Sequence, residues 1–137
     1  MENNLYIIWD NDKKLGIPII DEQHRGIIST INSLYYFIQN GHGTHVIKPT
    51  MIMLVQYTII HFETEEELMK KAGYSIIEEH IKMHEHLLKK TKALSVEAVI
   101  NKDPEMVLRF LKQWWLGHIN KEDKKYALQV KKILTSS

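Results

Sequence analysis

Apolar side chains recur at spacings of three and four residues in four successive stretches of the chain, and this period constrains the fold more than any other feature. Side chains so spaced share one face of an α-helix, so each stretch is predicted to form an amphipathic helix with one side in a core. No stretch shows the strict alternation expected of a strand. Four such helices with short connections predict an all-α fold, an antiparallel up-down-up-down four-helix bundle.

Local start and stop signals separate these helices from one another. Pro49 fits the first turn of the second helix, where its missing N–H costs nothing. Gly73 is the expected end of that helix, because glycine readily adopts the left-handed backbone of a helix stop. Ser75, with a glutamate three residues later, predicts a capping box at the third helix. Asp103 and Pro104 predict the start of the fourth, with the aspartate as N-cap.

The length of 137 residues suits one domain with a hydrophobic core. We expect a single domain over residues 1–137, and we divide it into three parts. These are an irregular N-terminal arm over residues 1–20, a four-helix bundle over residues 21–121 and a C-terminal segment over residues 122–137. Apolar residues in the last segment predict a short C-terminal helix.

Composition excludes several classes of function. With 18 basic and 17 acidic residues the formal net charge is only +1, which argues against nucleic-acid binding. The chain has no cysteine, so disulfides and thiolate metal sites are excluded. The N-terminus lacks the pattern of a signal peptide, and no segment approaches the roughly 20 apolar residues of a membrane helix. We therefore expect a cytoplasmic protein without membrane insertion.

Histidines lie on the inward stripes of all four predicted helices. A lone histidine on an apolar face is usually a hydrogen-bonded core residue, but helix backbone is already bonded internally and cannot satisfy five. A metal centre is the simplest common partner, and neutral imidazole suits iron, copper, zinc or nickel. The five inward histidines are His24, His61, His80, His84 and His118. The remaining three, His42, His45 and His86, lie off these stripes and are expected in solvent.

The number of ligands argues for two metals rather than one. Five imidazoles exceed a tetrahedral site, and bridging carboxylates would make the centre dinuclear. Glu65 lies on an inward stripe one turn after His61 and is the first such carboxylate. Asp123 is the second candidate, but it follows His118 by five residues, which on a straight helix turns the two side chains about 140° apart. Asp123 therefore reaches the centre only if the helix ends or distorts near residues 120–122, and spacing alone does not favour it over Glu122.

Several segments together resemble the hemerythrin family. The stretch from His61 to His84 has the family's core signature, HFETEEELMKKAGYSIIEEHIKMH. The first-helix histidine segment is matched by DEQHRGIISTIN, and the last by WWLGHINKEDKKY. The N-terminal stretch WDNDKKLGIPIIDEQH is similar to the arm of bacterial members, which occur as single domains or as sensor domains. The resemblance covers nearly the whole chain, and the family includes a known four-helix bundle.

The resemblance implies a non-haem di-iron site with seven protein ligands. One iron would be bound by His80, His84 and His118. The other would be bound by His24 and His61, with one position vacant for end-on dioxygen. Glu65 and Asp123 would bridge the pair. The implied cofactors are two irons, each Fe²⁺ or Fe³⁺, with a bridging oxide or hydroxide, and dioxygen as ligand.

The resemblance also implies an apolar pocket around the oxygen position. Phe62, Trp114 and Ile119 occupy the positions that line it, although plain core packing would explain each of them equally well. Tyr57 and Tyr126 are candidates for hydrogen bonds to ligands, and either could instead be only a buried aromatic residue.

The expected function is reversible dioxygen binding for transport, storage or delivery, without catalysis. The ligand set favours binding because the carboxylate-rich oxidases carry two Glu-x-x-His motifs, and the nearest approach here is Asp21 before His24. One alternative is an oxygen or redox sensor that signals to a partner. A less favoured one is a di-iron enzyme that reduces peroxide or nitric oxide. The expected partners are dioxygen and either an oxygen-using enzyme or a signalling protein.

Overall fold

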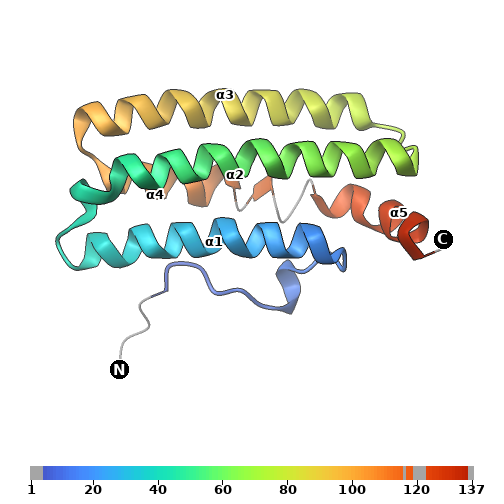
Figure 1. The fold of residues 1–137 in the computed structure, drawn as a ribbon, viewed down its shortest axis with the longest axis horizontal. Helices are drawn as coiled ribbons and strands as arrows, with labels where there is room; N and C mark the ends of the chain where they lie inside the picture. The colour runs from blue at the N-terminus through green and yellow to red at the C-terminus, as the bar shows by residue number, and fades with distance from the viewer. Residues whose placement is uncertain (1–4, 116, 119–122, 136–137) are drawn as a thin grey trace.

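The computed structural model describes residues 5–115, 117–118 and 123–135, and helices account for most of them (Figure 1). Over these residues the chain forms no strand. The helices are α1 (Pro18–Gln39), α2 (Gly43–Ala72), α3 (Ile77–Asn101), α4 (Pro104–Phe110) and α5 (Asp123–Thr135). A π-helical segment, Leu111–Trp115, follows α4 directly.

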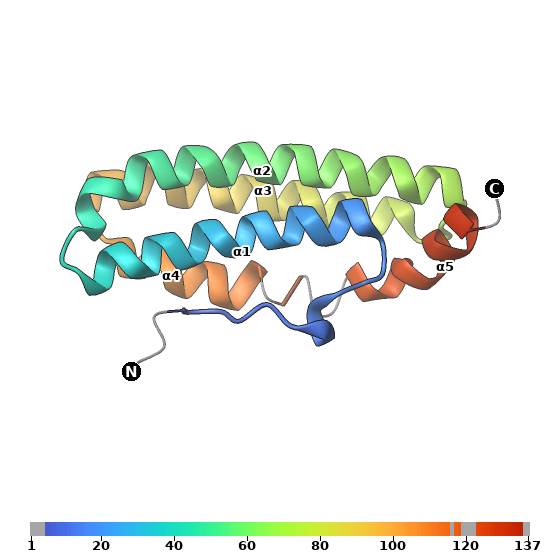
Figure 2. The same cartoon turned by 60° about the horizontal axis from the view of Figure 1, so that its bottom comes forward.

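The helices form the predicted four-helix bundle. Each of the pairs α1–α2, α2–α3, α3–α4 and α4–α1 is in contact, which closes the ring expected of an up-down-up-down arrangement. The fourth side of the bundle is shared, because α4 covers one half of its length and α5 packs on α2 at the other end (Figures 1 and 2). The predicted C-terminal helix is therefore confirmed and completes the fourth side.

Two of the helix boundaries follow the local sequence signals. The Asp103 carboxylate accepts a hydrogen bond from the backbone N–H of Met106 at 3.1 Å, with Pro104 as the first helical residue. Gly73 ends α2 with a left-handed φ of 64°, which a side chain would disfavour. Both predictions are confirmed.

Pro49 does not lie in the first turn of α2, so that prediction was wrong. The helix begins at Gly43, because the preceding turn closes early: the N–H of His42 bonds to the carbonyl of Phe37 at 2.8 Å. Gly43 lies so near α1 that a Cβ atom there would come within 2.7 Å of Ile38 Cγ1. Pro49 is exposed, and its ring faces away from the core. The first helix also begins earlier than residue 21, at Pro18.

The predicted capping box at Ser75 was also wrong. The N-cap of α3 is Ile76, and no side chain caps this end. Residues 74–77 form a turn in which the N–H of Ile77 bonds to the carbonyl of Tyr74 at 3.3 Å. Tyr74 is buried and packs edge-on against Tyr126 of α5, so tertiary contact rather than a cap fixes where α3 begins.

The N-terminal arm runs along α1 and is tied to it by two polar side chains (Figure 2). Asp21 accepts hydrogen bonds from the N–H groups of Leu15 at 2.8 Å and Gly16 at 3.1 Å. Asn32 accepts from the N–H groups of Tyr6 and Ile7 and donates to the carbonyl of Ile7. These bonds satisfy the backbone of an irregular segment that has no ladder of its own.

The apolar core is divided into two clusters. One contains Ile27 of α1 and Leu54 of α2, and the other contains Ile20 of α1 and Met69 of α2. On α1, His24 lies between the residues of the two clusters, so a buried polar layer separates them. Within the described ranges, none of the helices combines the length and hydropathy that crossing a bilayer requires.

Candidate metal centre

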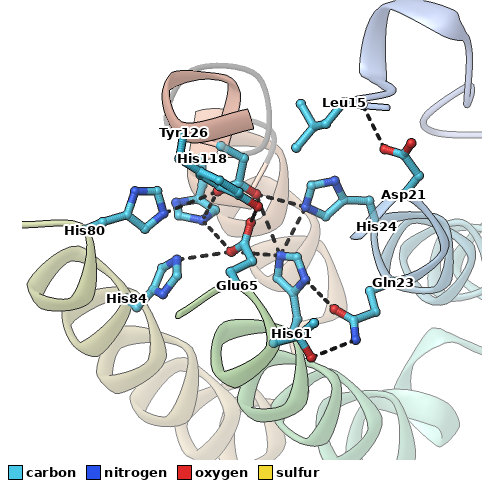
Figure 3. A network of polar contacts seen from close by, with 12 residues as sticks. Leu15, Asp21, Gln23, His24, His61, Glu65, His80, His84, His118 and Tyr126 are labelled. Carbon is cyan, nitrogen blue, oxygen red and sulfur yellow. Dashed lines mark hydrogen bonds and ion pairs between the residues drawn. The ribbon is translucent and has the colours of Figure 1, made fainter. Parts of the chain in front are cut away.

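The polar layer brings together all seven residues that the sequence singled out as ligands. Figure 3 shows the five histidines around Glu65. Every one of these side chains is at most 4% exposed, and Glu65 and Asp123 are fully buried. The ligand atoms fall into two groups, each with its atoms within 4.8 Å of one another. One group is Glu65, His80, His84, His118 and Asp123, and the other is His24, His61, Glu65 and Asp123. That these residues bind metal remains a prediction.

Two carboxylates belong to both groups. Glu65 Oε1 lies 3.2 Å from His61 Nε2 in one group and 3.2 Å from His84 Nε2 in the other. Asp123 places Oδ2 2.9 Å from His24 Nε2 and Oδ1 2.9 Å from His118 Nε2. Each carboxylate therefore contacts histidines on both sides of the layer, which is the position a bridging ligand requires.

Asp123 reaches the centre because the fourth side of the bundle is not one straight α-helix. The regular turns of α4 end at Phe110, the π-helical segment follows, and α5 begins at Asp123 itself. Five residues on a straight helix would have turned His118 and Asp123 away from each other. The break expected at residues 120–122 and the rival candidate Glu122 lie outside the described residues.

The donor set fits a metal better than it fits a network of hydrogen bonds. Over the described residues, His80 Nε2, His84 Nε2, Glu65 Oε1 and Asp123 Oδ1 are buried and make no hydrogen bond. A carboxylate oxygen accepts only, and a neutral imidazole has one nitrogen without a proton. Acceptor atoms that face one another in a buried layer are costly unless a cation lies between them. Imidazole and carboxylate together suit iron and related divalent metals.

Without metal, protons take the place of the cations. Burial opposes a charged imidazole, but the carboxylates of Glu65 and Asp123 outweigh it and raise the pKa of His61 to about 9. The same balance, with Asp123 as the strongest favourable contact, raises the pKa of His118 to about 10. Burial would raise the pKa of each carboxyl group, yet the neighbouring histidines hold the pKa of Glu65 and Asp123 below their ordinary values.

Tyr126 donates a hydrogen bond to Glu65 Oε2, the carboxylate oxygen that faces away from the histidines. Burial and the charge of Glu65 raise the pKa of Tyr126 far above its ordinary value, so the phenol keeps the proton it donates. Of the two alternatives for Tyr126, the structure therefore shows the hydrogen bond, and its acceptor is Glu65. Tyr57 packs instead against Gly26, where a Cβ atom would meet its ring at 3.1 Å, and no hydrogen bond to a ligand is found for it among the described residues.

Two residues behind the ligands were missed by the sequence analysis. Gln23 Oε1 lies 3.0 Å from His61 Nδ1, and Glu66 Oε2 lies 2.9 Å from His84 Nδ1. Each partner comes from a different helix than its histidine, so no spacing along the chain could have paired them. The only available signal was adjacency, since Gln23 precedes the ligand His24 and Glu66 follows the bridging Glu65.

Phe62 lies beside the ligand histidines. Its ring stacks on that of His84, with 3.8 Å between the ring centroids and 3° between the ring planes. The side chains of Trp114 and Ile119 lie outside the described residues, so an apolar pocket formed by all three stays a prediction. His42, His45 and His86 are exposed and belong to neither ligand group. Asp21 holds the arm instead of joining the centre.

Comparison with known proteins supplies independent findings. The family model of the hemerythrin HHE cation binding domain matches residues 15–129. Bacteriohemerythrin of Stenotrophomonas maltophilia is 35% identical over 126 residues, which are 91% of this chain and 82% of that protein. Myohemerythrin of Riftia pachyptila is 28% identical over 119 residues, which are 87% of this chain and 89% of that protein. A crystal structure of a leucine-to-tyrosine variant of hemerythrin has a TM-score of 0.79 at 25% identity and covers 91% of this chain and 97% of its own.

Proposed function

The chain belongs to the hemerythrin family, and on that premise we propose that it binds dioxygen reversibly at two non-haem irons in order to carry, store or deliver it. Membership of this family supports an oxygen-binding domain rather than an enzyme. A cytoplasmic location and an oxygen-using enzyme as the receiving partner stay predictions.

The unequal division of histidines between the two groups carries the proposal. Glu65 and Asp123 are common to both groups, but one group has three histidines and the other has two. With a solvent-derived bridge, three histidines and two carboxylates would supply six ligands to one iron, whereas two histidines and two carboxylates would supply only five to the other. Bound in these groups, an iron pair supplies two electrons and that one open position to dioxygen.

The surrounding side chains favour reversible binding over further chemistry. Both carboxylates are fully buried, and the layer lies between two apolar clusters that limit the entry of water. The phenol of Tyr126 donates a hydrogen bond to Glu65 Oε2, and this bond would hold the carboxylate in the orientation that bridging requires. Among the described residues, the ligand groups are histidine-rich and contain no carboxylates beyond these two.

The test is the iron content and visible spectrum of the anaerobically reduced protein through repeated addition and removal of oxygen. We expect about two irons per chain and a coloured adduct that disappears under vacuum and returns with oxygen. His61→Ala should lose iron from the two-histidine group and with it the adduct, whereas the exposed His42→Ala should behave as the unmodified chain. Irreversible oxidation at the first exposure to oxygen would contradict the proposal.

A further inference from the structure

The two ligand groups differ in what lies behind one histidine of each. The Nδ1 atom of His61 faces a neutral amide, Gln23, and the Nδ1 atom of His84 faces a carboxylate, Glu66. We propose that Gln23 and Glu66 are positioning residues that increase the difference between the two metal positions, beyond the difference in their number of histidines. This inference rests on the proposed function, because it concerns the same two positions.

A chain of hydrogen bonds fixes the orientation of Gln23. The hydroxyl of Thr64 donates to the carbonyl of Ile60 at 2.8 Å, so its oxygen is left to accept from the amide N–H of Gln23 at 3.1 Å. With its nitrogen so occupied, Gln23 presents Oε1 to His61 at 3.0 Å. An amide oxygen only accepts, so Nδ1 of His61 is the atom that carries the proton. Nε2 of His61 is then the ring nitrogen that faces the centre, 3.2 Å from Glu65 Oε1.

Glu66 fixes His84 in the same sense but with a charge. Its side chain is 24% exposed, while that of His84 is 1% exposed, so the carboxylate lies at the edge of the buried layer. Nδ1 of His84 donates to Glu66 Oε2, which leaves Nε2 to face Glu65. Both histidines thus have the tautomer that a metal ligand needs.

The difference in charge makes the two histidines unequal donors. A carboxylate draws the Nδ1 proton more strongly than an amide does, and so increases the electron density at Nε2. The three-histidine group, which contains His84, therefore holds its metal more tightly and favours the ferric state. The two-histidine group, which contains His61 and the open position, is held less tightly and returns to the ferrous state more easily, as reversible binding requires.

Exchanging the two partners tests the inference, with cobalt(II) added anaerobically to the metal-free protein as the probe. Cobalt absorption distinguishes five-coordinate from six-coordinate sites, so the two positions are followed separately. Glu66→Gln should weaken the six-coordinate site by about tenfold, and Gln23→Glu should strengthen the five-coordinate site by a similar factor. The matched controls are Glu67→Gln and Gln56→Glu, which make the same chemical changes at exposed positions of α2.

A second pair of variants separates positioning from a general effect of charge or folding. Thr64→Val removes the acceptor that orients Gln23 and changes no charge, so it should weaken only the five-coordinate site, while Thr64→Ser should restore it. In the iron-loaded protein, Glu66→Gln should raise the reduction potential and Gln23→Glu should lower it, both relative to their controls. A merely structural role would move the melting temperature without these opposite shifts.

The outcomes distinguish this inference from the proposed function. If the unmodified chain takes up two cobalt ions but the variants match their controls, the inference is wrong and the metal site stands. If the unmodified chain takes up fewer than two, the paired site is wrong and the inference fails with it. If Glu66→Gln weakens cobalt binding at one site and Gln23→Glu strengthens it at the other, while the control variants behave as the unmodified chain, the roles of Gln23 and Glu66 are established.

Discussion

The phenol of Tyr126 is the one neutral donor among the described contacts of Glu65, whose other contacts are histidines. A buried carboxylate is costly to desolvate, and each acceptor left without a donor adds to the cost. At the scale of single residues, the centre therefore depends on side chains that the ligand pattern itself does not reveal. Tyr126 was among the candidates for a hydrogen bond to a ligand, whereas Gln23 and Glu66 were not.

Removing the Tyr126 hydroxyl tests its contribution. We expect Tyr126→Phe to lower the free energy of unfolding of the iron-loaded protein by about 1–3 kcal/mol, because Glu65 Oε2 loses its donor in a buried layer. Urea denaturation followed by circular dichroism measures it. Tyr57→Phe is the control, since it removes a hydroxyl that is not bonded to a described ligand. Equal effects of the two substitutions would contradict the assigned role.

The raised pKa values predict how the metal-free protein responds to pH. His61 and His118, with pKa values of about 9 and about 10, stabilise the folded state while they are protonated. Because both values are raised, this stabilisation is complete below the ordinary histidine pKa of 6.5 and is lost as the pH rises through 9 and 10.

We therefore expect the free energy of unfolding of the metal-free protein to fall as the pH rises from about 6.5 to about 10. The iron-loaded protein is the control, because the nitrogens that bind iron carry no proton. Its free energy of unfolding should fall less over the same pH range. Chemical denaturation at a series of pH values measures both. If the free energy of unfolding depended on pH in the same way in both forms, His61 and His118 would not be the groups that hold protons in the folded metal-free protein.

Helix boundaries show what the sequence could predict at the scale of elements. Gly73 and Asp103 act through their own backbone or their own helix, so local signals were sufficient. The start of α3 at Ile77 depends on Tyr74 packing against α5, a contact between distant segments that a local motif cannot encode. The same holds for Asp123, which lies in the centre because the fourth side of the bundle departs from a straight α-helix after Phe110, and the break predicted at residues 120–122 lies outside the described residues.

Gly43 tests the close approach of α1 and α2 at the end of the bundle. A Cβ atom there would come within 2.7 Å of Ile38 Cγ1 and 3.0 Å of Pro104 Cγ. We expect Gly43→Ala to cost about 1–3 kcal/mol of stability through overpacking, with iron content unchanged. Thermal unfolding and iron analysis measure the two quantities. Gly117→Ala is the control, since none of the described residues lies within 4 Å of its added Cβ. A loss of stability in the control but not in Gly43→Ala would contradict the packing argument.

The whole molecule is an apolar bundle interrupted by one buried polar layer. The two hydrophobic clusters lie on either side of it, so folding brings seven polar ligand side chains out of water. The all-α class and the inward stripes that bring the five histidines and Glu65 together were predicted because each depends on periodicity within one helix, whereas Asp123 was selected through the family resemblance. The contacts between side chains of different helices could not be predicted in this way. The extent of the domain over residues 1–137 stays a prediction.

Metal removal should therefore lower the stability of the entire fold. A ligand that binds only the folded state stabilises it by about 2.7 kcal/mol at a free concentration of 100 times its dissociation constant. We expect chelation to lower the melting temperature of the protein and re-addition of iron to restore it, as measured by calorimetry. Identical melting temperatures with and without metal would show that the polar layer is satisfied without cations.

Anomalous diffraction at the iron edge, from crystals of the iron-loaded protein, tests the central claim most directly. The account predicts two iron peaks in the polar layer, both in contact with Glu65 and Asp123. One peak should be bound by His80, His84 and His118, and the other by His24 and His61 with one position open to dioxygen. A single peak, or two irons with equal numbers of protein ligands, would contradict it.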